Sequence, residues 1–398
     1  MSETYSNSTK SINNNDNNQN ESNNKKQKIN IVTKVHNTDK PNFNYQQKEV
    51  LSSTTNINES SYYTIDIHNK FQIYNEQNKI DKNYDILFRI RKNKDGDFEI
   101  ISPIEKMSYS DVNLIDQLDG KMWLVMKSED EKGKFNTDNE EYNLLENDII
   151  RIADKKYVII EKNIKNKSNS QENKNKINII NEKFGPVLEN EIDEEHNYVK
   201  DGEKCIKCDS SEDDQKLKLC DCPKHYECLK KEIKENIKTN KNSKETVTSY
   251  KCENYNCPTC KKPYPFKFIY KGQEFELIDI ERPSKDEDYI ILESLTFIKN
   301  GNNIKNIFVV KLTEENLTIG RNDKENKIEN DINDEEVTIS RSHAILKFNK
   351  ENGNLTIIND KGRYGVLVLI KDNIKLTANE KIYFQVGKTY VEAEVKVY

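Results

Sequence analysis

The sequence predicts a multidomain, mainly β chain in which two β-sandwich-like domains flank a cysteine-rich module, behind a disordered N-terminal tail. Short apolar or alternating runs recur in two separate regions, which is typical of antiparallel sheets. All eight cysteines fall between Cys205 and Cys260. A chain of 398 residues is also long enough for more than one domain of ordinary size.

The composition narrows the class of protein. Hydrophobic residues make up 34% of the chain and charged residues 33%, so a substantial part must be solvated rather than packed in a core. No run approaches the roughly 18 apolar residues of a membrane span, and the first residues lack the apolar segment of a secretion signal. We therefore expect an intracellular protein, cytoplasmic or nuclear, with no membrane partner. The net charge of −6 gives no general reason to expect nucleic-acid binding.

The N-terminal part divides by composition. Residues 1–60 are rich in Asn, Ser, Lys and Gln, which cannot bury enough apolar surface to offset the loss of chain entropy, so we expect a disordered tail. In residues 61–162, runs such as Ile86-Leu-Phe-Arg-Ile predict a small β domain. Residues 163–200 return to Asn, Lys and Glu and predict a polar linker.

The remaining chain predicts three further segments. Residues 201–266 contain the cysteines and residues 267–289 form a connecting segment. In residues 290–398, short apolar runs such as Ala344-Ile-Leu-Lys-Phe recur often enough to predict an antiparallel sandwich.

The two β regions share a local pattern. Asn147-Asp-Ile-Ile-Arg-Ile, followed by Tyr157-Val, is similar to Asn379-Glu-Lys-Ile-Tyr-Phe, followed by Tyr390-Val. Both regions are therefore expected to end in a similar hairpin, which suggests a duplicated fold on either side of the cysteine-rich module.

The cysteines and one histidine form four close pairs. Two ligands separated by one or two residues can reach the same ion without backbone strain, and intracellular thiols stay reduced, so the pattern predicts two Zn²⁺ ions. Cys252 is left over and could replace one of these ligands or be a free thiol. Leu229, Ile233 and Ile237 recur every four residues and predict a short amphipathic helix after the third pair. The pairs are Cys205 with Cys208, Cys220 with Cys222, His225 with Cys228, and Cys257 with Cys260.

This C4HC3 ligand order resembles the RING-CH family of zinc fingers and, less closely, PHD fingers. The resemblance implies a cross-brace, in which the first and third pairs share one ion and the second and fourth pairs share the other. It also implies recruitment of a ubiquitin-conjugating enzyme. In this chain Lys207 stands where such families usually have an apolar residue, whereas Lys261 stands where active ligases often have a cation.

Gly320-Arg321, followed by Ser340-Arg-Ser-His343 and Gly365, resembles the forkhead-associated (FHA) domain over residues 290–398. The resemblance implies a β sandwich whose loops bind phosphothreonine peptides, with Gly320, His343 and Gly365 as architectural residues. Tyr364 stands where the family usually has an Asn that binds the peptide backbone.

The chemistry of phosphothreonine supports the same residues. The group carries about −1.5 to −2 charges and three acceptor oxygens, so it calls for a fixed guanidinium and short donors. Arg321 would be the forked ligand and Ser340 would offer a hydroxyl and an amide, while Arg341 and Arg363 would add charge at the same end.

These patterns leave three functions open. The first is an intracellular signalling adaptor that binds a phosphothreonine segment through the FHA domain and a second protein through a structural two-zinc module. The second is a RING-type E3 ubiquitin ligase whose substrate choice depends on phosphorylation. The third is a structural scaffold. Between Asp85 and Trp123 the first β region contains neither a GR pair nor an SxxH motif, so it would serve as a degenerate, FHA-like scaffold.

Overall fold

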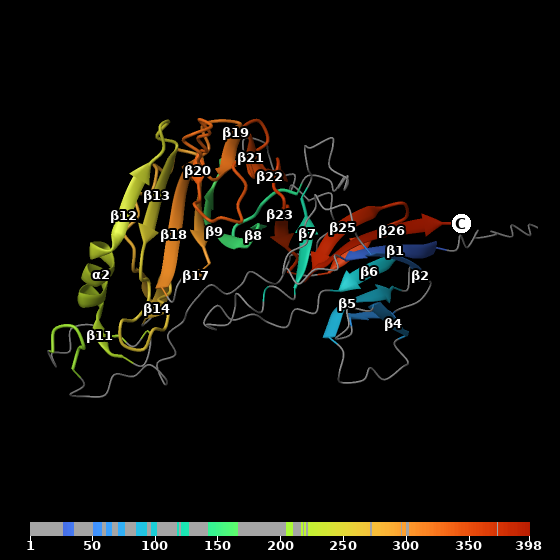
Figure 1. Cartoon of the computed structure of the whole chain (residues 1–398), viewed down its shortest axis with the longest axis horizontal. Coiled ribbons are helices and arrows are strands. Elements are labelled where there is room, and N and C mark those ends of the chain that lie inside the picture. Colours follow the sequence, from blue (N-terminus) through green and yellow to red (C-terminus); the bar gives the residue numbers. More distant parts are fainter. Residues whose placement is uncertain are drawn as a thin grey trace, which may run out of the picture.

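The computed structural model describes most of the predicted β regions and the cysteine-rich module. Within them, the prediction of a mainly β protein is confirmed, and strands dominate Figure 1. No helix in this described part has the length and apolar character needed to cross a membrane. The described residues are 27–35, 51–57, 61–65, 71–75, 85–93, 97–101, 118, 121–126, 142–165, 204–209, 216–217, 219, 222–270, 273–295, 297–299, 302–371 and 373–398.

One large sheet, built from strands of distant parts of the chain, runs the length of the molecule, from the strands beside the helix to the strands near the C-terminus (Figure 1). A short strand, β17 (Phe297–Lys299), pairs with β18 off this path. The order across the sheet is β12 (Ile237–Lys241), β13 (Val247–Cys252), β18 (Asn302–Lys311), β16 (Tyr289–Ser294), β9 (Lys155–Asn163), β8 (Ile149–Ile152), β23 (Val366–Leu369), β7 (Met122–Val125), β25 (Lys381–Val386), β26 (Thr389–Val397), β1 (Gln27–Val35) and β2 (Leu51–Ile57).

The strand order is the same on both sides of the central β23–β7 pair. Moving outward from β23 the strands are β8, β9, β16 and β18, and moving outward from β7 they are β25, β26, β1 and β2. The N-terminal half (residues 27–165) and the C-terminal half (residues 273–398) thus contribute corresponding strands in the same chain order. In each half, however, the last two strands pair with the other half. We call β8–β9 and β25–β26 the exchanged hairpins.

The exchange also involves the five-stranded and the four-stranded sheet. In one of these sheets a strand of the C-terminal half, β24, pairs with β6 of the N-terminal half. Beside the other, the backbone N–H of Leu144 donates to the carbonyl of Leu355 in β22 at 2.7 Å. The first has the order β24 (Ile374–Leu376), β6 (Phe98–Ile101), β5 (Asp85–Lys92), β3 (Ser61–Ile65) and β4 (Phe71–Asn75), and the second has the order β20 (Ile332–Asn333), β19 (Asn316–Gly320), β21 (Ala344–Asn349) and β22 (Asn354–Asn359).

The two exchanged hairpins begin with the same local geometry. Asn147 has a φ of 68° and Asn379 a φ of 65°, a left-handed conformation that Asn tolerates better than most residues. The carboxylate of Asp148 accepts the N–H three residues before it at 2.7 Å, and that of Glu380 does the same at 2.6 Å. The shared Asn-acidic pattern in the sequence therefore marks equivalent entries into two hairpins.

The expected division into one β domain at 61–162 and another at 290–398 differs from this arrangement. Pairs such as Leu292 with Ile159 and Val368 with Ile150 join the two segments in one sheet. Apolar alternation determines which face of a strand is buried, but it does not determine which strand it pairs with. The connecting segment 267–289 also contains a hairpin of its own, β14 (Lys267–Tyr270) with β15 (Gln273–Glu276).

The prediction that residues 1–60 form a disordered tail also differs from the structure. Strand β1 is hydrogen-bonded between β26 and β2, and Ile29, Ile31 and Thr33 are buried. These alternate residues form an apolar face within a stretch whose average composition is polar. Strand β2 also lies within the predicted tail, whereas residues 1–26, 36–50 and 58–60, and most of the predicted linker 163–200, lie outside the described residues.

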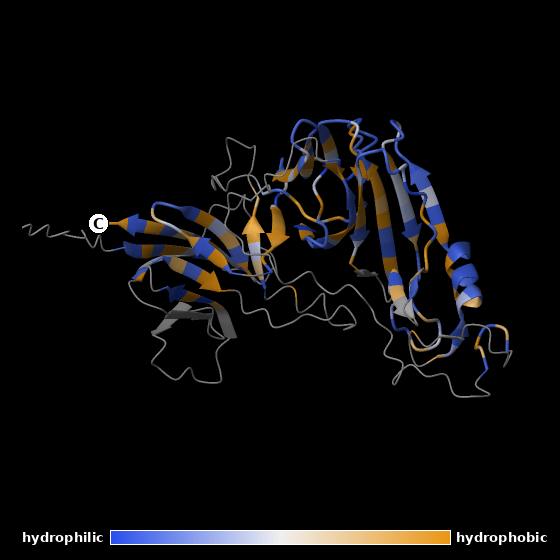
Figure 2. Cartoon of the chain, turned by 180° about the vertical axis from the view of Figure 1, so that it is seen from behind, coloured by the Kyte–Doolittle hydropathy of each residue, from blue (hydrophilic) through white to orange (hydrophobic). Residues whose placement is uncertain are grey.

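The cysteine-rich module contains the predicted helix and is continuous with the large sheet. Helix α2 spans Tyr226–Glu235, with Leu229 and Ile233 buried, whereas Ile237 begins β12. Glu227 in its first turn and Lys234 in its last turn complement the helix dipole. Figure 2 shows the hydrophobic residues gathered in the strands, while the helix is mostly hydrophilic.

We predict that the two halves stay together when the chain is cut between them. Cleavage at a protease site inserted within residues 166–203 would yield two fragments. The exchanged hairpin of each fragment would remain paired with strands of the other fragment. Size-exclusion chromatography should therefore show one complex until denaturant unfolds both fragments in a single transition. Fragments that separate in native buffer would contradict the exchange, and the uncut insertion variant is the control.

Candidate functional site

The first candidate metal centre combines the first and third ligand pairs. Ligand atoms of Cys205, Cys208, His225 and Cys228 all lie within 4.8 Å of one another. The Sγ of Cys208 is 3.2 Å from the Nδ1 of His225, and the Sγ of Cys228 is 3.8 Å from it. In a tetrahedral zinc site, metal–ligand distances of about 2.0–2.3 Å place neighbouring ligand atoms about 3.5–3.8 Å apart. This group can therefore hold a metal ion.

Chain geometry explains how these ligands meet. Cys205 and Cys208 belong to a turn closed by the hydrogen bond from the N–H of Asp209 to the carbonyl of Cys205 at 2.9 Å. His225 ends strand β11 (Lys224–His225) just before α2, so Cys228 lies one helical turn further on. The N–H of His225 also points to the Sγ of Cys205 at 3.4 Å, as backbone amides do toward metal-bound thiolates.

The second candidate centre contains Cys222, Cys257 and Cys260, whose Sγ atoms also lie within 4.8 Å of one another. The fourth predicted ligand, Cys220, lies outside the described residues. The N–H of Lys261, with φ 62°, donates to the carbonyl of Cys257 at 2.9 Å and closes the turn that carries the last pair. The described ligands are thus grouped in the alternating order that a cross-brace requires.

Cys252 belongs to neither group. It lies at the end of β13, 1% exposed, with its Sγ 4.0 Å from the carbonyl oxygen of Ile233. Burial raises the pKa of this thiol to about 12, and no other cysteine or histidine among the described residues joins it in a metal-binding group. Of the two roles left open by the sequence, the position favours that of a buried free thiol.

The cysteine-rich module, called the metal region from here on, contacts buried charged residues of the large sheet. Strand β13 pairs with β18, where the ammonium of Lys305 is buried against the carboxylate of Glu293. The same ammonium lies 5.8 Å from the ring centre of Tyr255, which is fully buried two residues before Cys257. Removing one partner of such a buried ion pair typically costs about 3–5 kcal/mol of the sheet's stability, and the contact of Lys305 with Tyr255 links the pair to the metal region.

The second group of predicted site residues converges at the end of β19. The N–H of Arg321 donates to the carbonyl of Ser340 at 3.1 Å, and the N–H of Arg363 lies 3.4 Å from the hydroxyl of Ser340. A Cβ atom on Gly320 would lie 2.3 Å from the carbonyl oxygen of Arg341, so only glycine fits there. Three loops distant in sequence therefore meet around Ser340.

His343 links these loops from inside. Its Nδ1 accepts the N–H of Ser340 at 2.9 Å, which leaves the proton on Nε2, and Nε2 donates to the carbonyl of Gly365 at 3.0 Å. The side chain is fully buried, and burial lowers its pKa to about 4. Gly365 adopts a φ of 71°, which favours glycine and directs its carbonyl toward the ring.

The three arginines near the end of β19 differ in whether their guanidinium groups are free to bind an anion. The guanidinium of Arg341 binds the carboxylate of Asp323 at 2.5 Å. Among the described residues, no hydrogen bond or ion pair engages the guanidinium groups of Arg321 and Arg363. The ring of Tyr364 packs against the hydrophobic core. Two of the three predicted cations are therefore open to an anion.

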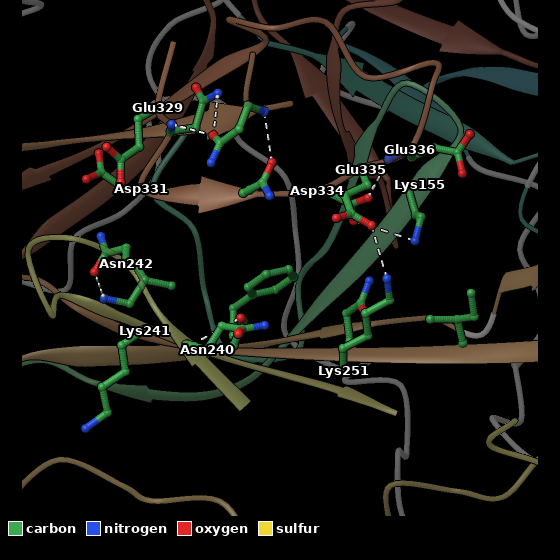
Figure 3. Close-up of a pocket in the computed structure, with 18 residues that line it drawn as sticks. Lys155, Asn240, Lys241, Asn242, Lys251, Glu329, Asp331, Asp334, Glu335 and Glu336 are labelled. Atoms are coloured by element: carbon green, nitrogen blue, oxygen red, sulfur yellow. Dashed lines mark hydrogen bonds and ion pairs between the residues drawn. The ribbon is translucent and has the colours of Figure 1, made fainter. Parts of the chain in front are cut away.

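A polar cavity of about 280 Å³ borders the same end (Figure 3). It lies between the β12–β13 hairpin and the loop 322–336 that follows Arg321. Lys251 pairs with Glu335 at 3.1 Å across it, and Lys155 approaches Asp334 at 3.5 Å. The cavity wall is thus shared by the metal region, the N-terminal half and the loop beside Arg321.

Sequence reasoning did not identify several residues that shape this end. A Cβ atom on Gly362 would lie 2.3 Å from the Cδ2 of His343, so this glycine makes room for the imidazole. Asn330 donates from its side chain to the carbonyl of Arg341 at 2.8 Å. The position of Gly362 between two polar residues is the sequence signal for a turn. The sequence does not show that the ring of His343, on another loop, leaves no room for a side chain there.

Comparisons with models of known protein families, with curated proteins and with solved structures found no match.

We predict that metal content separates the ligand cysteines from Cys252. Cys208→Ser and Cys257→Ser should each lose one bound ion, because each removes a ligand from a different group. Cys252→Ala should keep both ions and lose some stability through the cavity it creates. Mass spectrometry of metals per folded chain measures this, and a lost ion in the Cys252 variant would mean that the grouping is wrong.

We also predict a pH dependence carried by His343. The folded state holds its imidazole neutral, with a pKa of about 4 against an ordinary 6.5, so only the unfolded state takes up this proton as the pH falls between those values. The contribution to the free energy of unfolding is fully present above pH 6.5, decreases as the pH falls, and is lost by about pH 4, amounting to about 3 kcal/mol.

Urea unfolding of the wild type and His343→Gln over this range measures the difference. The variant should be less stable at neutral pH and should show a smaller decrease on acidification. Equal decreases in the two proteins would assign the acid sensitivity to other groups.

Proposed function

We propose that the protein is an adaptor whose C-terminal half binds phosphothreonine-containing protein segments in the manner of an FHA domain. The observation that carries this proposal is the convergence of Arg321, Ser340 and Arg363 on one edge, supported beneath by the imidazole of His343. A phosphate dianion needs a fixed fork-like donor and short hydroxyl and amide donors on rigid loops. These three residues supply groups of those kinds.

The geometry refines the roles of the individual residues. Arg321 is the primary phosphate ligand, since Gly320 fits closely under the backbone of Arg341 and fixes the turn. Arg363 supplies the second cation. Arg341 acts indirectly, because Asp323 holds its guanidinium. Tyr364 packs inward, so contact with the peptide backbone falls to other residues of this edge.

The metal region serves, in this proposal, as a structural module with two Zn²⁺ ions that binds a second protein. Thiolate and imidazole ligands in groups of four favour zinc among the common intracellular metals. Bound ions would be held by Cys205, Cys208, His225 and Cys228 in one group, and by Cys220, Cys222, Cys257 and Cys260 in the other. Ile206, 44% exposed between two ligands, offers an apolar contact for that second protein.

Arg321→Ala is expected to weaken binding of phosphothreonine peptides by about 10- to 100-fold, because one charge-assisted hydrogen-bonding group is worth about 1.5–3 kcal/mol. Fluorescence titration with a degenerate phosphothreonine peptide library measures the effect. Lys347→Ala, on the same half but in β21, is the matched control for loss of one positive charge. Unchanged affinity in Arg321→Ala, or equal binding of unphosphorylated peptides by the wild type, would remove the proposal.

A further inference from the structure

The exchanged hairpin β8–β9 brings polar side chains of the N-terminal half under the loop that follows Arg321. The hydroxyl of Tyr157 donates to the carboxylate of Asp334 at 2.6 Å, and the ammonium of Lys155 lies 3.5 Å from the same oxygen. All three residues are at most 4% exposed. In Figure 3, Lys155 and Asp334 point toward each other at the edge of the cavity.

Asp334 and its neighbour hold the chain on both sides of Arg321. The N–H of Asp334 donates to the carbonyl of Gly320 at 3.1 Å, directly before Arg321. The side chain of Asn333 accepts the N–H of Asn322 at 2.9 Å, directly after it. The strand β20 that contains Asn333 pairs with the end of β19. Residues 333 and 334 therefore hold the backbone on both sides of Arg321, whose own N–H is bonded to Ser340.

We propose that Tyr157 is a positioning residue for the anion-binding end, the group of loops around Arg321, Ser340 and Arg363. Through Asp334 it fixes the Gly320–Arg321 turn, so the N-terminal half completes the site of the C-terminal half. This inference rests on the proposed function and deepens it. The N-terminal half contributes no phosphate ligand of its own. Its contribution is the buried hydrogen bond from Tyr157, together with the charge of Lys155, on the exchanged hairpin.

The environment of Tyr157 supports a donor role. Burial, together with the charges of Asp334 and Glu336, raises the pKa of its hydroxyl well above the ordinary value, so the group stays protonated. The other oxygen of Asp334 accepts the N–H of Glu336 at 3.0 Å, which orients the carboxylate toward Tyr157. With Lys155 at the same oxygen, the carboxylate is compensated although it is buried.

Tyr157→Phe removes this hydrogen bond and keeps the ring in the core. Tyr289→Phe is the matched control, because Tyr289 is also buried and donates to the carboxylate of Glu161 at 2.5 Å between β16 and the same strand β9. We expect Tyr157→Phe to weaken binding of the phosphothreonine peptide library by about tenfold. Tyr289→Phe should bind as the wild type does. In an Arg321→Ala background, Tyr157→Phe should cause no further loss.

A second measurement does not depend on a ligand. Amide hydrogen exchange should be faster at Arg321 and Asp334 in Tyr157→Phe and unchanged there in Tyr289→Phe. If the wild type binds no phosphopeptide, the proposed function fails while this measurement still tests the positioning role. The inference would be overturned if Tyr157→Phe had the same amide hydrogen exchange and the same peptide affinity as Tyr289→Phe. An additive loss of peptide affinity in the Arg321→Ala background would also overturn it.

Discussion

The antiparallel pairing of the last strand of each half with a strand of the other half determines the architecture. Strand β9 pairs with β16, every residue of which is buried, and β26 pairs with β1 along its whole length. Burial of each Ile or Val on these strands contributes about 1.5–3 kcal/mol, so neither half can give up the other's hairpin without exposing its own core. The two halves are thus one folding unit although the chain between them contains the metal region.

The metal region shares this dependence because it extends the same sheet. The β12–β13 hairpin adds to β18, and the pair Lys305–Glu293 lies beneath Tyr255 at the base of the last two ligands. The pairing of β13 with β18 and the contact of Lys305 with the ring of Tyr255 therefore join the two parts. The metal ions would therefore stabilise more of the chain than the ligand loops alone.

Local patterns in the sequence predicted what depends on neighbouring residues. The close ligand pairs, the helix after Cys228, many strands and the matching hairpin entries at Asn147 and Asn379 all follow from short-range geometry. The grouping of the described ligands, expected from the RING-CH resemblance, agrees with the positions of their atoms.

What the sequence could not predict depends on which distant surfaces meet. Both hairpins have apolar alternation and equivalent entries, so no local feature indicates that each pairs with the other half. The bond between Tyr157 and Asp334 joins residues 177 positions apart. The average composition of residues 1–60 is polar, so it likewise gave no indication of the buried face of β1, formed by Ile29 and Ile31.

The two halves differ in what they contribute around the end of β19. A hairpin contributes backbone hydrogen bonds and an apolar face, and many sequences provide both. The loops around the end of β19 have stricter requirements, since Gly320 and Gly362 leave no room for a Cβ atom and His343 bonds through both ring nitrogens. The N-terminal half supplies an exchanged hairpin with Tyr157 and Lys155, whereas the closely packed loops belong to the C-terminal half.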